Sequence, residues 1–320
     1  MKAIIRTKYG SAEALALRDV ATPEPKEDQV LVKVHTAGVN PLDWHVLRGK
    51  PFFVRLMGFG LLKPKRPGLG SDLAGWVEAV GKNVTRFKVG DEVFGSGTGA
   101  FAEYALCPEK WLTLKPGCMT FEQAAGISVA GVTALQGLRA GGSVEPGQRV
   151  LINGASGGVG TFAVQIAKAQ GAHVTGVCSG KNIELIRSLG ADNVIDYTKE
   201  DYWRSDEKYD IVLDNAAYQS LFILIRSLKP TGIYVLVGGS TANFWRMMLF
   251  GALLSKKHGR KVTSVLAELN EEELRYLKEL IESGKVRVVV EKKFTLSETP
   301  EAMRFVEEGH TRGKTVLRVC

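Results

Sequence analysis

The chain of 320 residues is long enough for two domains, and its 45% hydrophobic and 24% charged residues are typical of soluble globular proteins. Its four widely spaced cysteines form no Cys-x-x-Cys pair, which argues against a zinc ribbon or a disulfide framework and favours a reducing, cytoplasmic compartment. The net charge of +8 permits attraction to polyanions, but no aromatic RNA-binding platform or DNA-reading helix accompanies it, so no nucleic-acid partner is expected. The apolar runs are too short for a signal peptide or a membrane span.

The first part of the chain, to about residue 120, predicts short strands separated by turns. Segment 29–39 (QVLVKVHTAGV) alternates apolar and polar residues, as a half-buried strand does. Segment 75–95 predicts two further strands around turn residues. We interpret this part as a β-rich domain, built as a small barrel.

A helical segment at 119–138 is followed by a regular alternation of strands and helices. The predicted strands are 149–153, 172–178, 192–197, 209–216 and 233–239, and the predicted helices are 161–170, 181–190 and 220–232, the last ending at its proline. Nearly continuous apolar strands alternating with helices predict an α/β domain whose parallel sheet is covered on both faces. The C-terminal segment 291–319 returns to strand, helix and strand, and we expect it to rejoin the first domain.

The glycine-rich segment 153–160 (NGASGGVG) lies between a predicted strand and a predicted helix. Ala155, Gly157 and Gly160 occupy the three positions of the dinucleotide-binding fingerprint, with alanine in place of the first glycine. The small residues permit a tight turn and close approach of a pyrophosphate, while the helix N-terminus offers free N–H groups to the phosphates. A tight turn alone would also be glycine-rich, but the position within successive βα units favours a nucleotide site.

The end of the second predicted strand bears on the choice of cofactor. An NAD site usually carries an acidic residue here to bind the ribose 2′-hydroxyl, whereas this chain has Cys178, followed by Ser179 and Lys181. A carboxylate would repel a 2′-phosphate, while a hydroxyl and an ammonium would bind it. The sequence therefore predicts NADPH, unless Lys181 is simply solvated at the start of a helix.

Several motifs in the same order, among them GSDLAGWVEAVG, GASGGVGTFAVQIAKAQGA and GHTRGKTVLRV, resemble the medium-chain dehydrogenase/reductase superfamily, and within it the zinc-independent quinone oxidoreductase branch. The resemblance runs over nearly the whole chain. It implies a GroES-like β-rich catalytic domain of residues 1–122 and 291–320 and a Rossmann NADPH-binding domain of residues 123–290. It also implies a homodimer, because edge strands of the Rossmann domain often pair in this family.

The resemblance implies a set of site residues, which are carried over by motif. Cofactor contacts are expected at Thr133, Ala155, Ser156, Gly157, Gly158, Val159, Gly160, Ser179, Lys181, Tyr197, Asn215, Gly238, Gly239 and Ser240. Asn40 and Lys314 are expected at the catalytic end, and His45 and Tyr104 are candidate proton donors beside water. Trp44, Phe52 and Phe53 are expected at the substrate.

Zinc is expected to be absent. Zinc-dependent relatives carry a cysteine where this chain has Asn40, and a His-Glu pair where it has Ser71 and Asp72, so the ligand set of a catalytic zinc is missing. A makeshift site from Asp43, His45 and Asp72 is the remaining metal alternative. Without a Lewis acid an easier electrophile is needed, and a quinone or an α,β-unsaturated carbonyl meets that need. The alternatives are a non-catalytic NADPH-binding sensor or scaffold, and a zinc-type alcohol dehydrogenase.

Two segments, 49–68 and 243–261, combine aromatic residues, methionine and leucine with arginine and a cluster of basic residues. We interpret them as walls or lids around a small apolar substrate, since ligand pockets are mostly apolar. Core packing and contact with an anionic membrane surface are the two alternatives.

Overall fold

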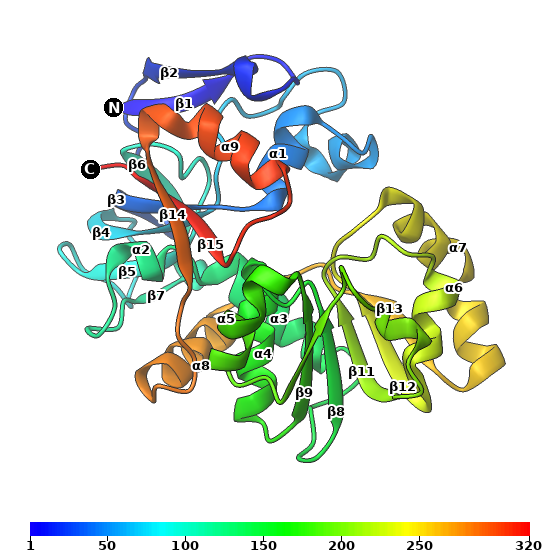
Figure 1. Cartoon of the computed structure of the whole chain (residues 1–320). Coiled ribbons are helices and arrows are strands. Elements are labelled where there is room, and N and C mark those ends of the chain that lie inside the picture. The colour runs from blue at the N-terminus through cyan, green and yellow to red at the C-terminus, as the bar shows by residue number, and fades with distance from the viewer. The chain divides into compact units, whose positions relative to one another are not determined.

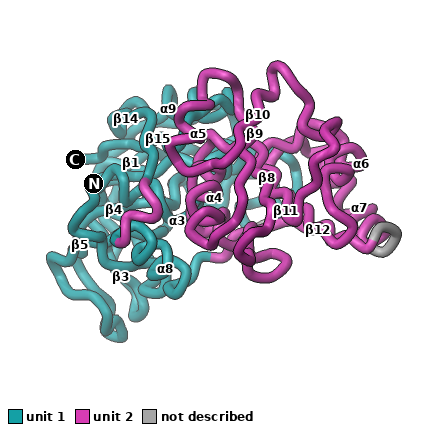
Figure 2. Tube along the Cα trace, turned by 60° about the horizontal axis from the view of Figure 1, so that its bottom comes forward, with its two compact units in different colours: residues 1–130, 269–282, 288–320 teal, residues 131–268, 283–287 magenta. Residues whose placement is uncertain are grey.

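The structure, a computed structural model, describes residues 1–56, 58–255 and 259–320. The chain forms two compact units (Figure 2). Unit 1 comprises residues 1–130, 269–282 and 288–320, and unit 2 comprises residues 131–268 and 283–287. The domain boundaries expected from the sequence, at 122/123 and 290/291, stay a prediction.

Unit 1 contains a seven-stranded sheet in the order β14–β15–β3–β4–β5–β7, with β6 also paired to β3 (Figure 1). The strands are β3 (Gln29–Val39), β4 (Asp72–Val80), β5 (Glu92–Ser96), β6 (Tyr104–Pro108), β7 (Leu112–Leu114), β14 (Val290–Thr295) and β15 (Lys314–Arg318). A separate hairpin joins β1 (Lys2–Arg6) to β2 (Leu15–Asp19). The helices of this unit are α1 (Pro41–Arg48), α2 (Phe121–Ala124), α8 (Glu271–Glu282) and α9 (Thr299–Glu307).

Strand β3 has the bounds that the sequence predicts, but it is more deeply buried than an alternating pattern suggests. Only Gln29, Lys33 and His35 of its residues are not buried. The reason is its central position, because β3 pairs with β15, β4 and β6 and so has neighbours along both edges.

The C-terminal segment confirms the predicted return to strand, helix and strand within unit 1. Strands β14 and β15 pair in parallel, which requires a crossover connection, and α9 supplies it. Strand β15 then pairs antiparallel with β3, so that Thr315 lies opposite Val39. This pairing brings the start of β15, at Lys314, to the end of β3.

Unit 2 contains a six-stranded sheet in which all pairings are parallel, in the order β10–β9–β8–β11–β12–β13 (Figure 1). The strands are β8 (Arg149–Asn153), β9 (His173–Cys178), β10 (Asn193–Asp196), β11 (Tyr209–Asp214), β12 (Leu228–Leu236) and β13 (Lys261–Ser264). The helices are α4 (Gly158–Ala169), α5 (Ile183–Ser188), α6 (Leu221–Leu224) and α7 (Thr241–His258), while α3 (Ser128–Arg139) lies across the division of the units. Counted along the chain the strand order is 3-2-1-4-5-6, the order of the Rossmann fold.

The predicted helix over 220–232 is wrong in its second half. Helix α6 ends at Leu224, one turn of 3-10 helix follows, and β12 begins at Leu228. Pro230 lies within this strand, where a proline cannot donate a ladder hydrogen bond. The register shift between the pairs Tyr209–Leu228 and Ile211–Ile233 places the proline in an irregular stretch of the ladder that tolerates it.

Strand β13 and helices α7 and α8 were not predicted from the sequence. Strand β13 has only four residues, too few for a periodic pattern to be detected. Among the described residues, no helix is both long enough and apolar enough to cross a lipid bilayer.

Candidate active site

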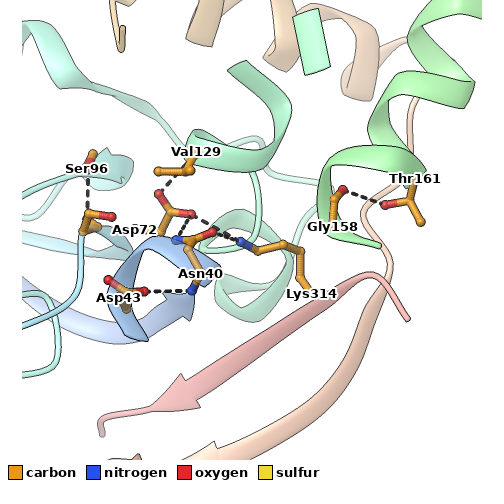
Figure 3. A network of polar contacts seen from close by, with 9 residues as sticks. Asn40, Asp43, Asp72, Ser96, Val129, Gly158, Thr161 and Lys314 are labelled. Carbon is orange, nitrogen blue, oxygen red and sulfur yellow. Dashed lines mark hydrogen bonds and ion pairs between the residues drawn. The ribbon is translucent and has the colours of Figure 1, made fainter. Parts of the chain in front are cut away.

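The glycine-rich turn lies where β8 ends and α4 begins, as the sequence predicts. Gly154 adopts a positive φ of 69°, which turns the chain sharply away from the strand. Gly157 is the residue before the first turn of α4, and Ala155 is buried beneath the turn. The Thr161 hydroxyl donates to the carbonyl of Gly158 at 3.0 Å, closing the first turn of the helix (Figure 3).

Gly160 and Gly157 have different roles in this turn. A Cβ at Gly160 would lie 2.2 Å from the Gly154 carbonyl oxygen and 2.7 Å from Ala155 Cα, so only glycine lets the helix pack on the turn. A Cβ at Gly157 would meet nothing closer than the Gly154 oxygen at 3.5 Å. The main chain at Gly157 is therefore bare, and the space that a side chain would fill remains open to a ligand.

Residues Ser156 to Val159 are partly exposed at the N-terminus of α4. The first N–H groups of a helix have no partner within the helix, and the macrodipole places partial positive charge there. A bare turn of this kind fits the pyrophosphate of a dinucleotide.

The residues expected at a 2′-phosphate lie at the carboxyl ends of two neighbouring strands. Cys178 at the end of β9 pairs with Asp196 at the end of β10, and the Tyr197 N–H donates to the Cys178 carbonyl at 3.1 Å. Ser179 is half-buried and accepts a hydrogen bond from the Asn182 side chain at 3.3 Å. Lys181 and Tyr197 are exposed.

Asp196 is a carboxylate at this edge that the sequence reasoning missed. Its Oδ1 accepts from the Thr198 hydroxyl at 2.7 Å, and this hydrogen bond lowers the pKa of Asp196. A Cβ on Gly180 would lie only 2.7 Å from the other oxygen, so the carboxylate sits directly against the turn after β9. The signal was present in the sequence, because Asp196 is the next-to-last residue of the third predicted strand, 192–197.

The remaining predicted cofactor residues lie on α3 and after β11 and β12. Asn215 donates from Nδ2 to the Asn153 carbonyl at 2.9 Å, while its buried Oδ1 has no hydrogen-bond partner within the described parts of the chain. Gly238 and Gly239 follow β12, and Ser240 accepts from the Asn243 N–H as the cap of α7. Thr133 is buried on α3. The unpaired oxygen of Asn215 is an acceptor at the same sheet edge as the glycine turn, which fits a nucleotide site.

In unit 1 the ends of three strands bring together Asn40, Asp72 and Lys314 (Figure 3). Asn40 follows β3, Asp72 begins β4 and Lys314 begins β15. Asn40 Nδ2 donates to Asp72 Oδ2 at 3.0 Å, and Lys314 Nζ donates to Asn40 Oδ1 and lies 3.5 Å from Asp72 Oδ2. All three side chains are at least 97% buried. We call these residues the Asn–Asp–Lys cluster.

The electrostatics of the cluster are those of buried charges that compensate one another. Burial raises the pKa of Asp72, while the ammonium of Lys314, the amide of Asn40 and the N–H of Val129 act to lower it. Asp43 lies on α1 beside the cluster and accepts from the Asn40 N–H at 2.7 Å. Burial raises the pKa of Asp43 to about 7.

His45, the expected proton donor, makes a local contact instead of joining the cluster. Its Nδ1 lies 2.9 Å from the Lys50 carbonyl oxygen, and its ring stacks on Trp44 with 3.6 Å between the ring centroids. Burial lowers the pKa of His45. Tyr104, the other candidate, begins β6 opposite Lys33. Neither residue has a hydrogen bond to the Asn–Asp–Lys cluster within the described residues.

The three expected substrate residues have different surroundings. Trp44 and Phe53 pack against the hydrophobic core of unit 1. Phe52 is 59% exposed, with the Arg55 guanidinium 5.7 Å from the centre of its ring. Across the part of the chain that the structure describes, no group of three His, Cys, Asp or Glu side chains is arranged to hold a metal ion.

The strand order of unit 2 and its glycine turn define a Rossmann fold. Unit 1 adds a second sheet of seven strands. Two family models match the chain, "Alcohol dehydrogenase GroES-like domain" over residues 26–117 and "Zinc-binding dehydrogenase" over residues 189–317. The first of these confirms the GroES-like character expected of the β-rich part.

Relatives match the chain over almost its full length. The chloroplast envelope quinone oxidoreductase homolog of Arabidopsis thaliana is 33% identical, over 99% of this chain and 98% of the relative. The mitochondrial NAD(P)H oxidoreductase RTN4IP1 of Bos taurus is 35% identical (100% and 89%), and the 2-methylene-furan-3-one reductase of Solanum lycopersicum is 35% identical (99% and 79%).

Solved structures also match the chain over its full length. The quinone oxidoreductase of Coxiella burnetii has a TM-score of 0.88 at 33% identity and covers 100% and 99% of the two chains. The Escherichia coli quinone oxidoreductase complexed with NADPH has a TM-score of 0.84 at 25% identity and covers both chains fully. The chain belongs to the medium-chain dehydrogenase/reductase superfamily, in its quinone oxidoreductase-like branch. Because two of these relatives are named for chloroplast envelope and mitochondrion, the cytoplasmic location stays a prediction.

Proposed function

We propose that this protein is an NADPH-dependent reductase that transfers hydride to a small apolar quinone or to an α,β-unsaturated carbonyl, without zinc. The observation that carries the proposal is the bare main chain at Gly157, at the N-terminus of α4 in a Rossmann sheet. Relatives named quinone oxidoreductase, NAD(P)H oxidoreductase and 2-methylene-furan-3-one reductase support the same reaction class.

The residues of unit 2 would bind and orient the cofactor. The N–H groups at the start of α4 would receive the pyrophosphate, and Lys181 and Ser179 would receive the 2′-phosphate. The oxygen of Asn215 is an acceptor for a ribose hydroxyl. When bound, the reduced nicotinamide supplies the hydride, while the protein contributes position and electrostatics.

The Asn–Asp–Lys cluster offers positive charge for the anion that hydride addition leaves on the acceptor oxygen. The Lys314 ammonium has three N–H donors, of which one bonds to Asn40 and a second points to Asp72. A donor that is held in place before the reaction stabilises developing charge without reorganisation. A proton from water then completes the reduction to the hydroquinone or to the saturated carbonyl.

The same cluster supports a reaction without metal. A zinc ligand must present its lone pairs to the ion, but Asp72 accepts hydrogen bonds from Asn40 and from the Val129 N–H and faces the ammonium of Lys314. Metal analysis of the purified protein tests this point directly. One tightly bound zinc per chain would contradict it.

The reaction class is tested by following NADPH oxidation with a panel of quinones, enals and saturated aldehydes, and NADP+ reduction with simple alcohols. We expect turnover with the quinones and enals alone. Turnover confined to alcohol oxidation would contradict the proposal. Tight NADPH binding without turnover on any member of the panel would instead support the alternative of a non-catalytic NADPH-binding sensor or scaffold.

The choice between NADPH and NADH needs its own test, because Asp196 places a negative charge beside the expected 2′-phosphate residues. We expect the dissociation constant of NADPH to be lower than that of NADH. Lys181→Glu should weaken NADPH binding at least about tenfold and leave NADH nearly unchanged, since only NADPH carries the extra phosphate. The exposed Lys110→Glu in unit 1 is the matched control. Tighter binding of NADH by the unaltered protein would overturn the assignment.

A further inference from the structure

One segment of unit 2, residues 215–267, contains no acidic residue at all. Its seven basic residues are Arg226, Lys229, Arg246, Lys256, Lys257, Arg260 and Lys261. Since the whole chain has 42 basic and 34 acidic residues and a net charge of +8, this segment supplies nearly all of the net positive charge. Such asymmetry indicates attraction to an extended anionic partner.

Helix α7 lies in this segment, and its exposed face is apolar. Trp245, Met248, Leu249 and Leu253 follow the pattern i, i+3, i+4 and i+8, which places them on one side of the helix. Their exposed fractions are 49%, 63%, 71% and 61%. The opposite side, with Met247 and Leu254, packs into the core of unit 2. The helix is thus apolar on the side that faces solvent as well as on the side that is buried.

Phe222 on α6 and Tyr218 before α6 add to the exposed apolar surface. Phe222 is 44% exposed, with its ring centre 5.9 Å from that of Phe250, and Tyr218 is 75% exposed. The α6–α7 face is defined by Tyr218, Phe222, Trp245, Met248, Leu249, Phe250 and Leu253. Monomeric soluble proteins rarely expose contiguous apolar patches of this kind without a partner.

Two arginines of this segment are not neutralised by an acidic side chain of the described residues. Arg226 is exposed, and Arg246 donates to the Asn243 side-chain oxygen at 3.0 Å. Among the described residues neither arginine forms an ion pair, whereas Lys229 pairs with Asp210 at 2.8 Å. The lysines at 256 and 257 lie outside the described residues. Unpaired cations beside exposed aromatic and aliphatic side chains match the surface of an anionic bilayer.

A second copy of this chain is a poorer partner for the α6–α7 face. Two copies joined through it would bring their acid-free basic segments together, and like charges at a desolvated interface cost free energy. A nucleic acid would satisfy the charge but would leave the leucine and methionine side chains without an apolar environment.

We propose that the α6–α7 face docks on the surface of a membrane rich in anionic lipids, with α7 lying in the plane of the interface. The exposed apolar side chains enter the region between headgroups and acyl chains, and Arg226 and Arg246 remain with the phosphates. This docking requires neither NADPH nor substrate, so it is independent of the proposed reaction.

The test is co-flotation of the full-length protein with vesicles made of equal parts phosphatidylcholine and phosphatidylglycerol. Pure phosphatidylcholine vesicles and high salt serve as comparisons. We expect binding to the mixed vesicles, weaker binding at high salt because charges are screened, and little binding to the neutral vesicles.

Two double variants separate the apolar and the electrostatic contributions. Leu249→Gln with Leu253→Gln should lower the partition coefficient roughly 100-fold, because two leucines no longer leave water. Arg226→Gln with Arg246→Gln should lower it roughly 30-fold at low salt. Val89→Gln, which alters an apolar residue of unit 1 that is 64% exposed, is the control and should bind as the unaltered protein does.

Three results would overturn the proposal. The first is no binding of the unaltered protein to mixed vesicles at low salt. The second is a leucine double variant that binds as tightly as the control. The third is a dimer, seen by light scattering, that the leucine double variant converts to a monomer, because the face would then belong to a second copy. Circular dichroism of each variant verifies that it is folded.

Discussion

The two polar centres of this protein are built in opposite ways. In unit 1 the Asn–Asp–Lys cluster relies on buried side chains, with the Lys314 ammonium enclosed by Asn40 and Asp72. In unit 2 the glycine turn relies on the lack of side chains, because Gly157 leaves the main chain bare. The first centre should therefore be damaged when atoms are removed, and the second when atoms are added.

The largest effect should follow an addition at Gly160. A Cβ there would lie 2.2 Å from a backbone oxygen, a distance that real Cβ atoms do not reach. We expect Gly160→Val to lower the free energy of unfolding by more than about 4 kcal/mol, measured by urea unfolding. Gly117→Val, where nothing lies within 4 Å of the added Cβ, is the matched control. Equal stabilities for the two variants would show that the turn can move.

A removal at Lys314 should be the next most harmful change. Lys314→Met leaves Asp72 buried without its counter-charge, which should cost about 3 to 5 kcal/mol of unfolding free energy. Lys293→Met removes an exposed ammonium from Glu122, whose buried carboxylate keeps Arg318 as a partner at 2.8 Å, and should cost at most about 1 kcal/mol. Adding Asp72→Asn to Lys314→Met should recover part of the loss. No recovery would mean that Lys314 stabilises the fold by packing alone.

The third prediction concerns pH. Burial raises the pKa of Asp43 from its ordinary 3.8 to about 7, so the protonated form is favoured in the folded state. The group's contribution to stability is fully present below pH about 4 and is lost as the pH rises through about 7. In the unaltered protein, this group should lower the free energy of unfolding by roughly 2 to 4 kcal/mol between low and neutral pH. In Asp43→Asn that decrease should be absent, which urea unfolding at the two pH values measures. An unchanged pH dependence would contradict the raised pKa.

The smallest effect on stability should follow an addition at Gly157, where a Cβ has room. Gly157→Ala should change the free energy of unfolding by less than about 1 kcal/mol and still weaken NADPH binding roughly tenfold, because the added carbon occupies space next to the main chain. Isothermal titration calorimetry and urea unfolding on the same sample give both numbers. Unchanged binding would mean that no phosphate approaches this residue.

The difference between the two centres also explains how much of each the sequence could predict. The glycine turn is local, since Ala155, Gly157 and Gly160 lie within six residues and their spacing carries the geometry. The Asn–Asp–Lys cluster is not local, because Lys314 is 274 residues from Asn40. The resemblance to a family suggested that Asn40 and Lys314 lie at the same end of the site. Their hydrogen bond with each other and with Asp72 came from the pairing of β15 with β3.

Some local patterns were outweighed by tertiary contacts. An asparagine before a helix predicts a side-chain cap, yet Asn40 turns its amide to Asp72 and Lys314, while Asp43 accepts the Asn40 N–H. The helix expected up to Pro230 ends early because β12 pairs with β11 from Leu228 onward. In both cases a partner distant in sequence competes with the local preference and prevails.

The sequence by itself determined the alternation of strands and helices, the glycine turn and the segment without acidic residues, because each depends on residues close together in the chain. Only the tertiary structure decided which charges are buried against one another and which apolar side chains stay exposed. Burial depends on strands and helices that meet from distant parts of the chain, and it sets the raised pKa of Asp43 as well as the exposed α6–α7 face.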